Sequence, residues 1–123
     1  MASELRVNTL KDASGNNSVA TSTVAEGTAK AWASRTSAAT PATNDSFNIA
    51  SLTDAGTGDT EYNLSSAMNN DGGACACANQ STSGDFGLFG DWKTTSKLRT
   101  LSRNSSGTDT DRGVTIMGTG DLA

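Results

Sequence analysis

The sequence has no histidine, one proline and only two cysteines among its 123 residues. Without histidine, neither a Ser-His-Asp triad nor a Cys-His pair can form. The aspartates lie among Ser, Thr and Gly, where they are far more often turn formers than catalysts. We therefore expect a protein that is not an enzyme and that holds no cofactor.

The two cysteines, Cys75 and Cys77, stand in the run Ala-Cys-Ala-Cys-Ala. On a strand they share one face, too close along the chain for ordinary disulfide geometry. Two thiols cannot complete a four-ligand metal site within one chain. We predict that both pack as small apolar side chains and that no metal is bound; a trimer bringing six thiols together near its axis is the alternative.

Large apolar residues are also scarce. Leu, Ile, Val and Phe supply 17 of 123 residues, below the roughly 20% under which chains are often disordered. The formal net charge is only −4, so the high charge that accompanies disorder is missing. A chain with so small a core can reach stability by sharing it with copies of itself, and we predict an obligate oligomer.

Basic residues number nine, against 13 acidic ones, and the sequence pI is near 4.5. The one local basic cluster is Lys93, Lys97, Arg99 and Arg103, which we interpret as a solvated strand surface. We expect no nucleic-acid partner. The sequence has no transmembrane run, and its first seven residues carry an acid where a secretory signal has basic residues. We therefore expect no membrane insertion and synthesis in a cytoplasm, with release only by lysis or by assembly into a particle.

The stretch 45–68 is the best-organised part of the chain. A glycine-rich turn at 53–59 separates two runs of period two, which together predict a β-hairpin. In the first run Phe47, Ile49 and Ser51 alternate with Asn48, Ala50 and Leu52, and in the second Thr60, Tyr62 and Leu64 alternate with Glu61 and Asn63. We take the rest of the domain to be built onto this hairpin.

The N-terminal residues read as extended, with Leu5, Val7 and Thr9 on one face and a turn at 12–17. A lone terminal strand either frays or adds to a sheet edge on another molecule, and we favour docking through Leu5, Val7 and Leu10. Residues 21–33 are a second extended candidate, because Gly27 and the threonines argue against a helix.

Further strands are expected at 74–80, 97–103 and 114–118, with an irregular loop at 34–46 and an irregular aromatic segment at 85–92. Short strands at roughly ten-residue spacing predict an all-β fold, a small antiparallel β-sandwich or barrel. The residues expected in its core or in a subunit interface are Trp32, Phe47, Ile49, Leu52, Tyr62, Leu64, Cys75 and Cys77.

Three segments resemble a recurrent module of bacteriophage fibre proteins: Gly27-Thr-Ala-Lys-Ala-Trp32, the run Asp45-Ser-Phe-Asn to Gly-Thr-Gly-Asp59, and Tyr62-Asn-Leu-Ser-Ser-Ala-Met68. The opening Ser3-Glu-Leu-Arg-Val-Asn-Thr-Leu10 is similar to virion-attachment segments, and the final Gly-Thr-Gly-Asp-Leu-Ala123 to common C-termini of that family. After Trp32 the family continues with an apolar and aromatic stretch, whereas this chain is polar, which leaves the course of that strand open. The resemblance is densest at 27–68 and weak from 80 to 113.

The resemblance implies a homotrimeric virion structural protein, with an extended N-terminal docking arm at 1–25 and a β-sandwich domain at 26–123. The expected partners are other virion proteins of tail, baseplate or capsid, and the location is the virion, assembled in the host cytoplasm. Two alternatives to a fibre stay open. One is a capsid decoration protein; the other is a tip that binds a host surface glycan through Phe86, Phe89, Trp92 and the loop 104–113.

Overall fold

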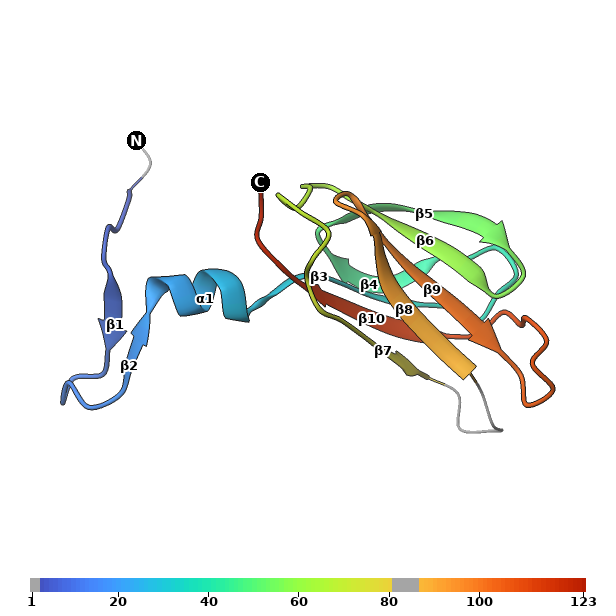
Figure 1. Ribbon diagram of the computed structural model, residues 1–123, viewed down its shortest axis with the longest axis horizontal. Coiled ribbons are helices and arrows are strands. Elements are labelled where there is room, and N and C mark those ends of the chain that lie inside the picture. Colours follow the sequence, from blue (N-terminus) through green and yellow to red (C-terminus); the bar gives the residue numbers. More distant parts are fainter. Residues whose placement is uncertain (1–2, 81–86) are drawn as a thin grey trace.

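Two four-stranded antiparallel sheets form the body of the protein (Figure 1). The computed structural model describes residues 3–80 and 87–123. The first sheet has the order β4-β3-β10-β7 and the second the order β5-β6-β9-β8. Their strands are β3 (Ala29–Arg35), β4 (Thr43–Phe47), β5 (Ile49–Gly56), β6 (Asp59–Leu64), β7 (Cys75–Asn79), β8 (Gly87–Thr94), β9 (Lys97–Arg103) and β10 (Val114–Thr119). The predicted all-β antiparallel architecture is confirmed.

The predicted hairpin is present as β5 and β6. The Asp54 carboxylate accepts a hydrogen bond from the Gly56 amide, and Gly58 has a φ of +72°. A Cβ at Gly58 would lie 2.5 Å from the Ser102 carbonyl oxygen, so the turn needs glycine there for both conformation and space. This turn is local chemistry, which explains why the sequence reveals it.

The first predicted strand of that hairpin is wrong at its start, because the chain changes sheet at Asn48. Asn48 has a φ of +57°, and its amide nitrogen donates to the carbonyls of Lys30 and Ser66 at 3.0 Å. Phe47 therefore belongs to β4 in the first sheet, where it pairs with Trp32. A bulge after Ile49 then shifts the alternation, so that Ile49 and Leu52 both pack on the core.

The core lies between the sheets and uses few large side chains. Its fully buried members are Ala31, Ala33 and Ile116 from the first sheet and Tyr62 and Leu98 from the second, with Ile49, Leu52, Leu64, Cys75, Cys77 and Trp92 packed against them. Small residues on the first sheet leave room for large ones on the second. Trp32 and Phe47, predicted for the core or a subunit interface, lie outside this core, on the outer face of the first sheet.

Other expected elements differ in detail. The irregular loop expected at 34–46 shrinks to 36–42, because β3 and β4 extend into it from both sides. The aromatic segment expected to be irregular forms strand β8 from residue 87 onward, paired with β9 with one register shift between Trp92 and Thr94. The strand expected at 97–103 is β9, with the expected bounds.

The N-terminal segment, residues 3–28, stands outside both sheets (Figure 1). A hairpin of β1 (Thr9–Lys11) and β2 (Ser18–Ala20) confirms the turn expected at 12–17, where the Asp12 carboxylate accepts the Asn16 amide. Helix α1 (Thr21–Gly27) follows, so the extended conformation predicted for 21–33 is wrong over its first seven residues. The helix buries no residue and has no side-chain N-cap; at its end the Thr28 hydroxyl and the Lys30 ammonium both donate to the Val24 carbonyl. A seven-residue helix without a buried face leaves no apolar periodicity in the sequence from which it could be predicted.

Candidate functional site

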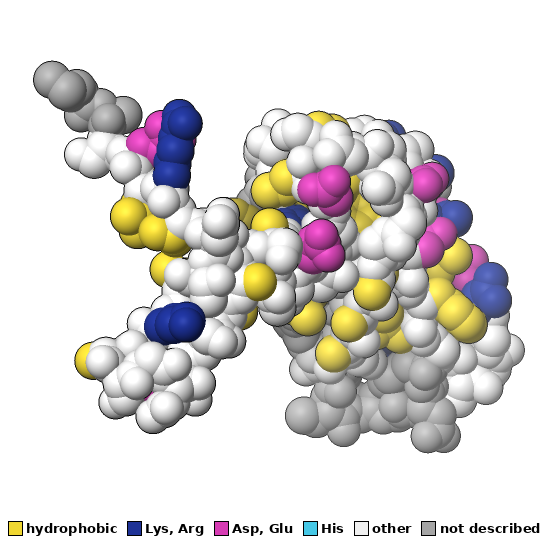
Figure 2. Space-filling model, turned by 60° about the vertical axis from the view of Figure 1, so that its left-hand side comes forward, with side chains coloured by type: hydrophobic (Ala, Val, Ile, Leu, Met, Phe, Trp, Pro, Cys, Tyr) yellow, Lys and Arg dark blue, Asp and Glu magenta, His cyan; other side chains and the backbone are white. Residues whose placement is uncertain are grey.

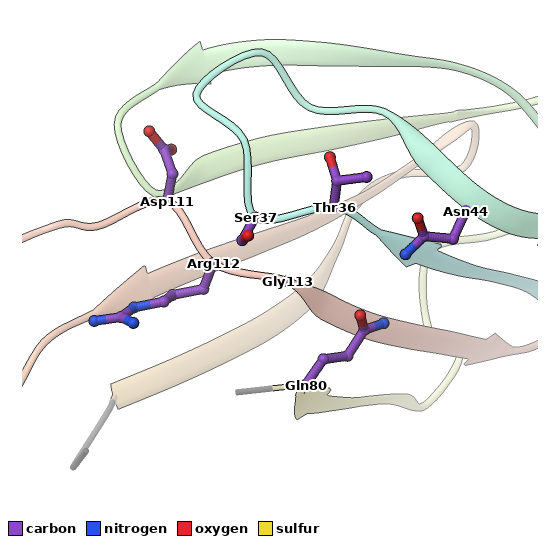
Figure 3. A pocket seen from close by; sticks show the side chains of 7 residues that line it. All are labelled: Thr36, Ser37, Asn44, Gln80, Asp111, Arg112 and Gly113. Atoms are coloured by element: carbon purple, nitrogen blue, oxygen red, sulfur yellow. The ribbon is translucent and has the colours of Figure 1, made fainter. Parts of the chain in front are cut away.

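A polar pocket of about 510 Å³ opens at the end of the sheets opposite to the N-terminal segment (Figures 1 and 3). The strands explain its position, since β3 starts next to α1 and runs to Arg35, directly before the pocket. Its lining is Thr36, Ser37, Asn44, Gln80, Asp111, Arg112 and Gly113. Thr36 and Ser37 follow β3, Gln80 follows β7, and Asn44 lies near the start of β4. The other three residues end the long loop before β10.

A small hydrogen-bond network fixes the two amide side chains of the pocket. Gln80 Nε2 donates to Ser34 Oγ at 2.6 Å and to Thr115 Oγ1 at 2.9 Å. Asn44 Nδ2 donates to the same Ser34 Oγ at 3.3 Å. With their nitrogens held in this way, the oxygens of Asn44 and Gln80 stay available as acceptors toward the pocket.

Asp111 ties the pocket to the β5–β6 turn, because its carboxylate accepts the Gly58 amide at 2.8 Å. The pocket thus presents amide oxygens, the hydroxyls of Thr36 and Ser37, one carboxylate and the Arg112 guanidinium. This mixture of neutral and charged polar groups suits a polyhydroxylated ligand. No side chain in the lining is a strong nucleophile, and none is aromatic.

The three aromatic residues predicted to contact a receptor are not brought together. Phe89 is 56% exposed on the outer face of the second sheet, with the Arg103 guanidinium 5.9 Å from its ring centroid. Trp92 lies on the opposite face of β8, where it packs on the core and its indole N–H donates to the Ala74 carbonyl. Phe86 lies outside the described residues. The loop 104–113 does reach the pocket, through Asp111, Arg112 and Gly113.

An apolar row crosses the outer face of the first sheet. Phe47 pairs with Trp32, Trp32 with Met117, and Met117 with Ala76, so one side chain from each of the four strands stands in register. Phe47 is 53% exposed and Met117 42% exposed. A contiguous exposed apolar strip of this kind is typical of a contact surface.

The outer face of the second sheet is different, because its charges neutralise one another. Glu61 bonds to Lys93 and, at 2.7 Å, to Lys97. Arg99 forms a two-pronged ion pair with Asp59 at 2.6 and 2.9 Å. The hydrogen bonds from Lys93 and Lys97 lower the pKa of Glu61 to about 2. The basic cluster of the sequence is therefore a paired, solvated surface, as the sequence indicates.

The residues predicted to dock the protein are exposed on the N-terminal segment. Leu5 is 79% exposed, Val7 38% and Leu10 44%, and Val24 of α1 adds a fourth apolar side chain at 40%. Figure 2 shows hydrophobic side chains along this segment, beside the larger body of the protein. Leu5 and Val7 precede β1, so the paired strand is shorter than the sequence predicts.

Cys75 and Cys77 point inward against Gly90, where a Cβ would lie 3.2 and 3.0 Å from their sulfurs. Burial raises the pKa of Cys75 to about 11, with smaller contributions from Cys77 and Asp91, and burial also raises the pKa of Cys77. Within residues 3–80 and 87–123, no three potential His, Cys, Asp or Glu ligands gather around one point. The same part of the chain has no helix with the length and apolar character needed to cross a membrane.

Sequence reasoning missed most of the pocket. Thr36, Ser37, Asn44 and Gln80 come from two stretches that look like ordinary polar loops, and no spacing links them to the 111–113 segment. Only the pairing of β3 with β4 and β10, and of β10 with β7, brings them together. Neither a protein-family model nor a curated protein nor a solved structure matches this chain.

Proposed function

We propose that this protein is a non-enzymatic structural component of a bacteriophage particle, a homotrimeric fibre or spike that its N-terminal segment docks onto the particle. The observation that carries the proposal is the N-terminal segment itself. It adds nothing to the core, yet it exposes Leu5, Val7, Leu10 and Val24 to solvent. An isolated two-stranded hairpin is marginally stable in water, so this segment gains most from a partner surface.

The proposal of a trimer is supported by the contrast between the outer faces of the first and second sheets. The second sheet covers its outer face with charges that pair within the chain. The first sheet instead presents the apolar row of Phe47, Trp32, Met117 and Ala76. Burying this row against neighbouring copies would add apolar area to a chain whose own core is small.

Truncation tests the docking role. A chain that begins at Thr28 removes the hairpin and α1 without cutting the helix, and should stay folded and trimeric while it no longer joins particles. Full-length Leu5→Ser/Leu10→Ser should lose incorporation in the same way, and Ser14→Ala in the β1–β2 turn is the matched control. Incorporation can be measured by quantitative mass spectrometry of purified particles. Normal incorporation of the truncated chain would disprove the docking role.

The subunit contact is tested by placing a charge on either face. Met117→Lys should convert the trimer to a monomer, whereas Phe89→Lys, at an exposed position of the other sheet, should leave it trimeric. Light scattering coupled to size exclusion gives the mass of each variant. A wild-type protein that is monomeric, or a Met117→Lys variant that stays trimeric, would disprove that the apolar row forms the subunit contact.

A second candidate function, binding of a host surface glycan, is favoured by the pocket. It lies at the end of the sheets away from the docking segment, so a docked protein would present it outward (Figure 1). A glycan array with wild type and with Gln80→Ala/Asn44→Ala tests it, with Asn63→Ala on the second sheet as control. Absence of any wild-type binding would exclude this function. A capsid decoration role, which shares the segment and the trimer, is separated from a fibre by imaging the protein on head or tail.

A further inference from the structure

Arg35 is the last residue of β3, and its side chain is buried inside the protein. It is 1% exposed, and the alternation along β3 places it on the same face as the core residues Ala31 and Ala33. All three guanidinium nitrogens are buried and have no hydrogen-bond partner among residues 3–80 and 87–123. A buried polar side chain without partners is rare in native proteins and requires a physical explanation.

The surroundings of Arg35 are polar but offer no described negative charge. Thr60, Thr100 and Ser102 are buried on the facing strands of the second sheet, and Tyr62 Oη lies 3.2 Å from Thr100 Oγ1. Burial raises the pKa of Tyr62, and the Thr100 hydrogen bond and the Arg35 charge both act against that rise. The positive charge of Arg35 is therefore felt electrostatically at the Tyr62 hydroxyl.

The acidic groups nearest to this end of the sheets are engaged elsewhere. Asp59 pairs with Arg99, Asp109 with Arg103, and Asp111 accepts the Gly58 amide. Among the described residues, these three aspartates thus leave the guanidinium uncompensated.

Arginine cannot escape this situation by losing its proton, because the guanidinium stays protonated in proteins. An unpaired buried charge is strongly destabilising. Buried water would satisfy the N–H groups but would not neutralise the charge, whereas a bound anion does both. Because Arg35 is closed off from solvent, the anion must be small. This requirement excludes a phosphate, a sugar acid and the carboxylate of a partner.

We propose that Arg35 holds a buried monovalent inorganic anion of the chloride class between the two sheets, with one hydroxyl of the Tyr62–Thr100 pair as a neutral donor. The site is independent of the proposed virion role, since it concerns how the sandwich is stabilised at its pocket end. It makes the folded state chloride-dependent, because an ion bound only by the folded protein stabilises it by mass action.

The test compares the stability of the full chain in sodium chloride and in sodium gluconate at equal ionic strength and equal protein concentration. Once the site is near saturation, each tenfold rise in chloride should raise the folding equilibrium constant about tenfold, with gluconate producing no such rise. Arg35→Met should lose the difference between the salts, and it should be at least as stable as wild type in gluconate. Arg99→Met, which removes a charge on the outer face, should keep the chloride response.

A measurement on the wild type keeps the test independent of whether Arg35→Met folds. Crystals grown in bromide should show an anomalous peak within hydrogen-bond distance of the guanidinium. An equal response to chloride and gluconate, a chloride response that survives in Arg35→Met, or electron density for waters alone beside Arg35 would each overturn the proposal.

Discussion

Gly118 of the first sheet packs against Trp92 and Leu98 of the second, and replacing it with alanine measures how tightly the two sheets fit there. A Cβ there would lie 2.5 Å from Trp92 Cζ2, 3.0 Å from Cε2 and 3.1 Å from Leu98 Cδ2. Ordinary carbon contacts are near 3.5–4.0 Å, so the indole would have to retreat by about 1 Å. It cannot retreat freely, because Trp92 packs on the core and donates its N–H to the Ala74 carbonyl.

Overpacking of this kind costs about 1–3 kcal/mol, and alanine recovers about 0.5–1 kcal/mol of the strand penalty of glycine. We therefore expect Gly118→Ala to lower the free energy of unfolding by about 1–2 kcal/mol, measured by urea denaturation with far-UV circular dichroism at fixed protein concentration. Gly27→Ala is the matched control, since its Cβ would meet only Thr23 Cγ2 at 3.9 Å. In a double-mutant cycle with Trp92→Phe, the two losses should be less than additive by about 1 kcal/mol. A Gly118→Ala variant as stable as wild type, or strictly additive losses, would refute the packing argument.

Three further predictions concern single side chains. The folded-state pKa of Glu61 is about 2, below its ordinary value of 4.5, so its stabilising effect is complete above pH 4.5 and disappears as the pH falls through 2. The difference in urea midpoint between wild type and Glu61→Gln should shrink over that range, and a constant difference would contradict the argument. Because burial raises the pKa of Cys75 from 9.0 to about 11, iodoacetamide at pH 8 should alkylate it about a hundredfold more slowly than an unperturbed cysteine, as mass spectrometry would show; rapid labelling would contradict its buried position. Asn48→Ala should cost about 2 kcal/mol in urea unfolding, because it removes the hydrogen bonds of the sheet-changing corner and strains the positive φ. Asn48→Gly should lose less, since it keeps the conformation, and equal losses would show that the conformation is unimportant.

The parts of the fold that follow from the sequence are those governed by neighbouring residues. The β5–β6 turn depends on Asp54, Gly56 and Gly58, which lie within five positions of one another. The corner at Asn48 could not be foreseen, because the alternation of apolar residues runs through it without a break. Which sheet Phe47 and Ile49 join is decided by their partners, Trp32 for one and Leu64 for the other.

The candidate functional residues likewise fall into those that the local sequence reveals and those that depend on distant strand pairing. The exposed apolar residues of the N-terminal segment are evident from the sequence, because an extended or hairpin segment of ten residues can bury little. The pocket depends on distant pairings, and the polar character of Asn44 and Gln80 is no different from that of other loop residues. The inward position of Arg35 did have a local signal, since it continues the alternation of Ala31 and Ala33. The polar composition of that stretch concealed it, because a charged residue at the end of a strand normally faces solvent.

The pairing of β3 with β10 has a consequence for the order of events during synthesis. These two strands are the central pair of the first sheet, yet they are the first and last strands of the sandwich along the chain. Until β10 has left the ribosome, β3 and β7 have no common neighbour and each presents an open hydrogen-bonding edge. Native pairing across such a large sequence separation is slow compared with hairpin formation. The local β5–β6 and β8–β9 hairpins therefore form first, and a chain that stalls before residue 114 exposes two unpaired edges that can capture strands from other copies.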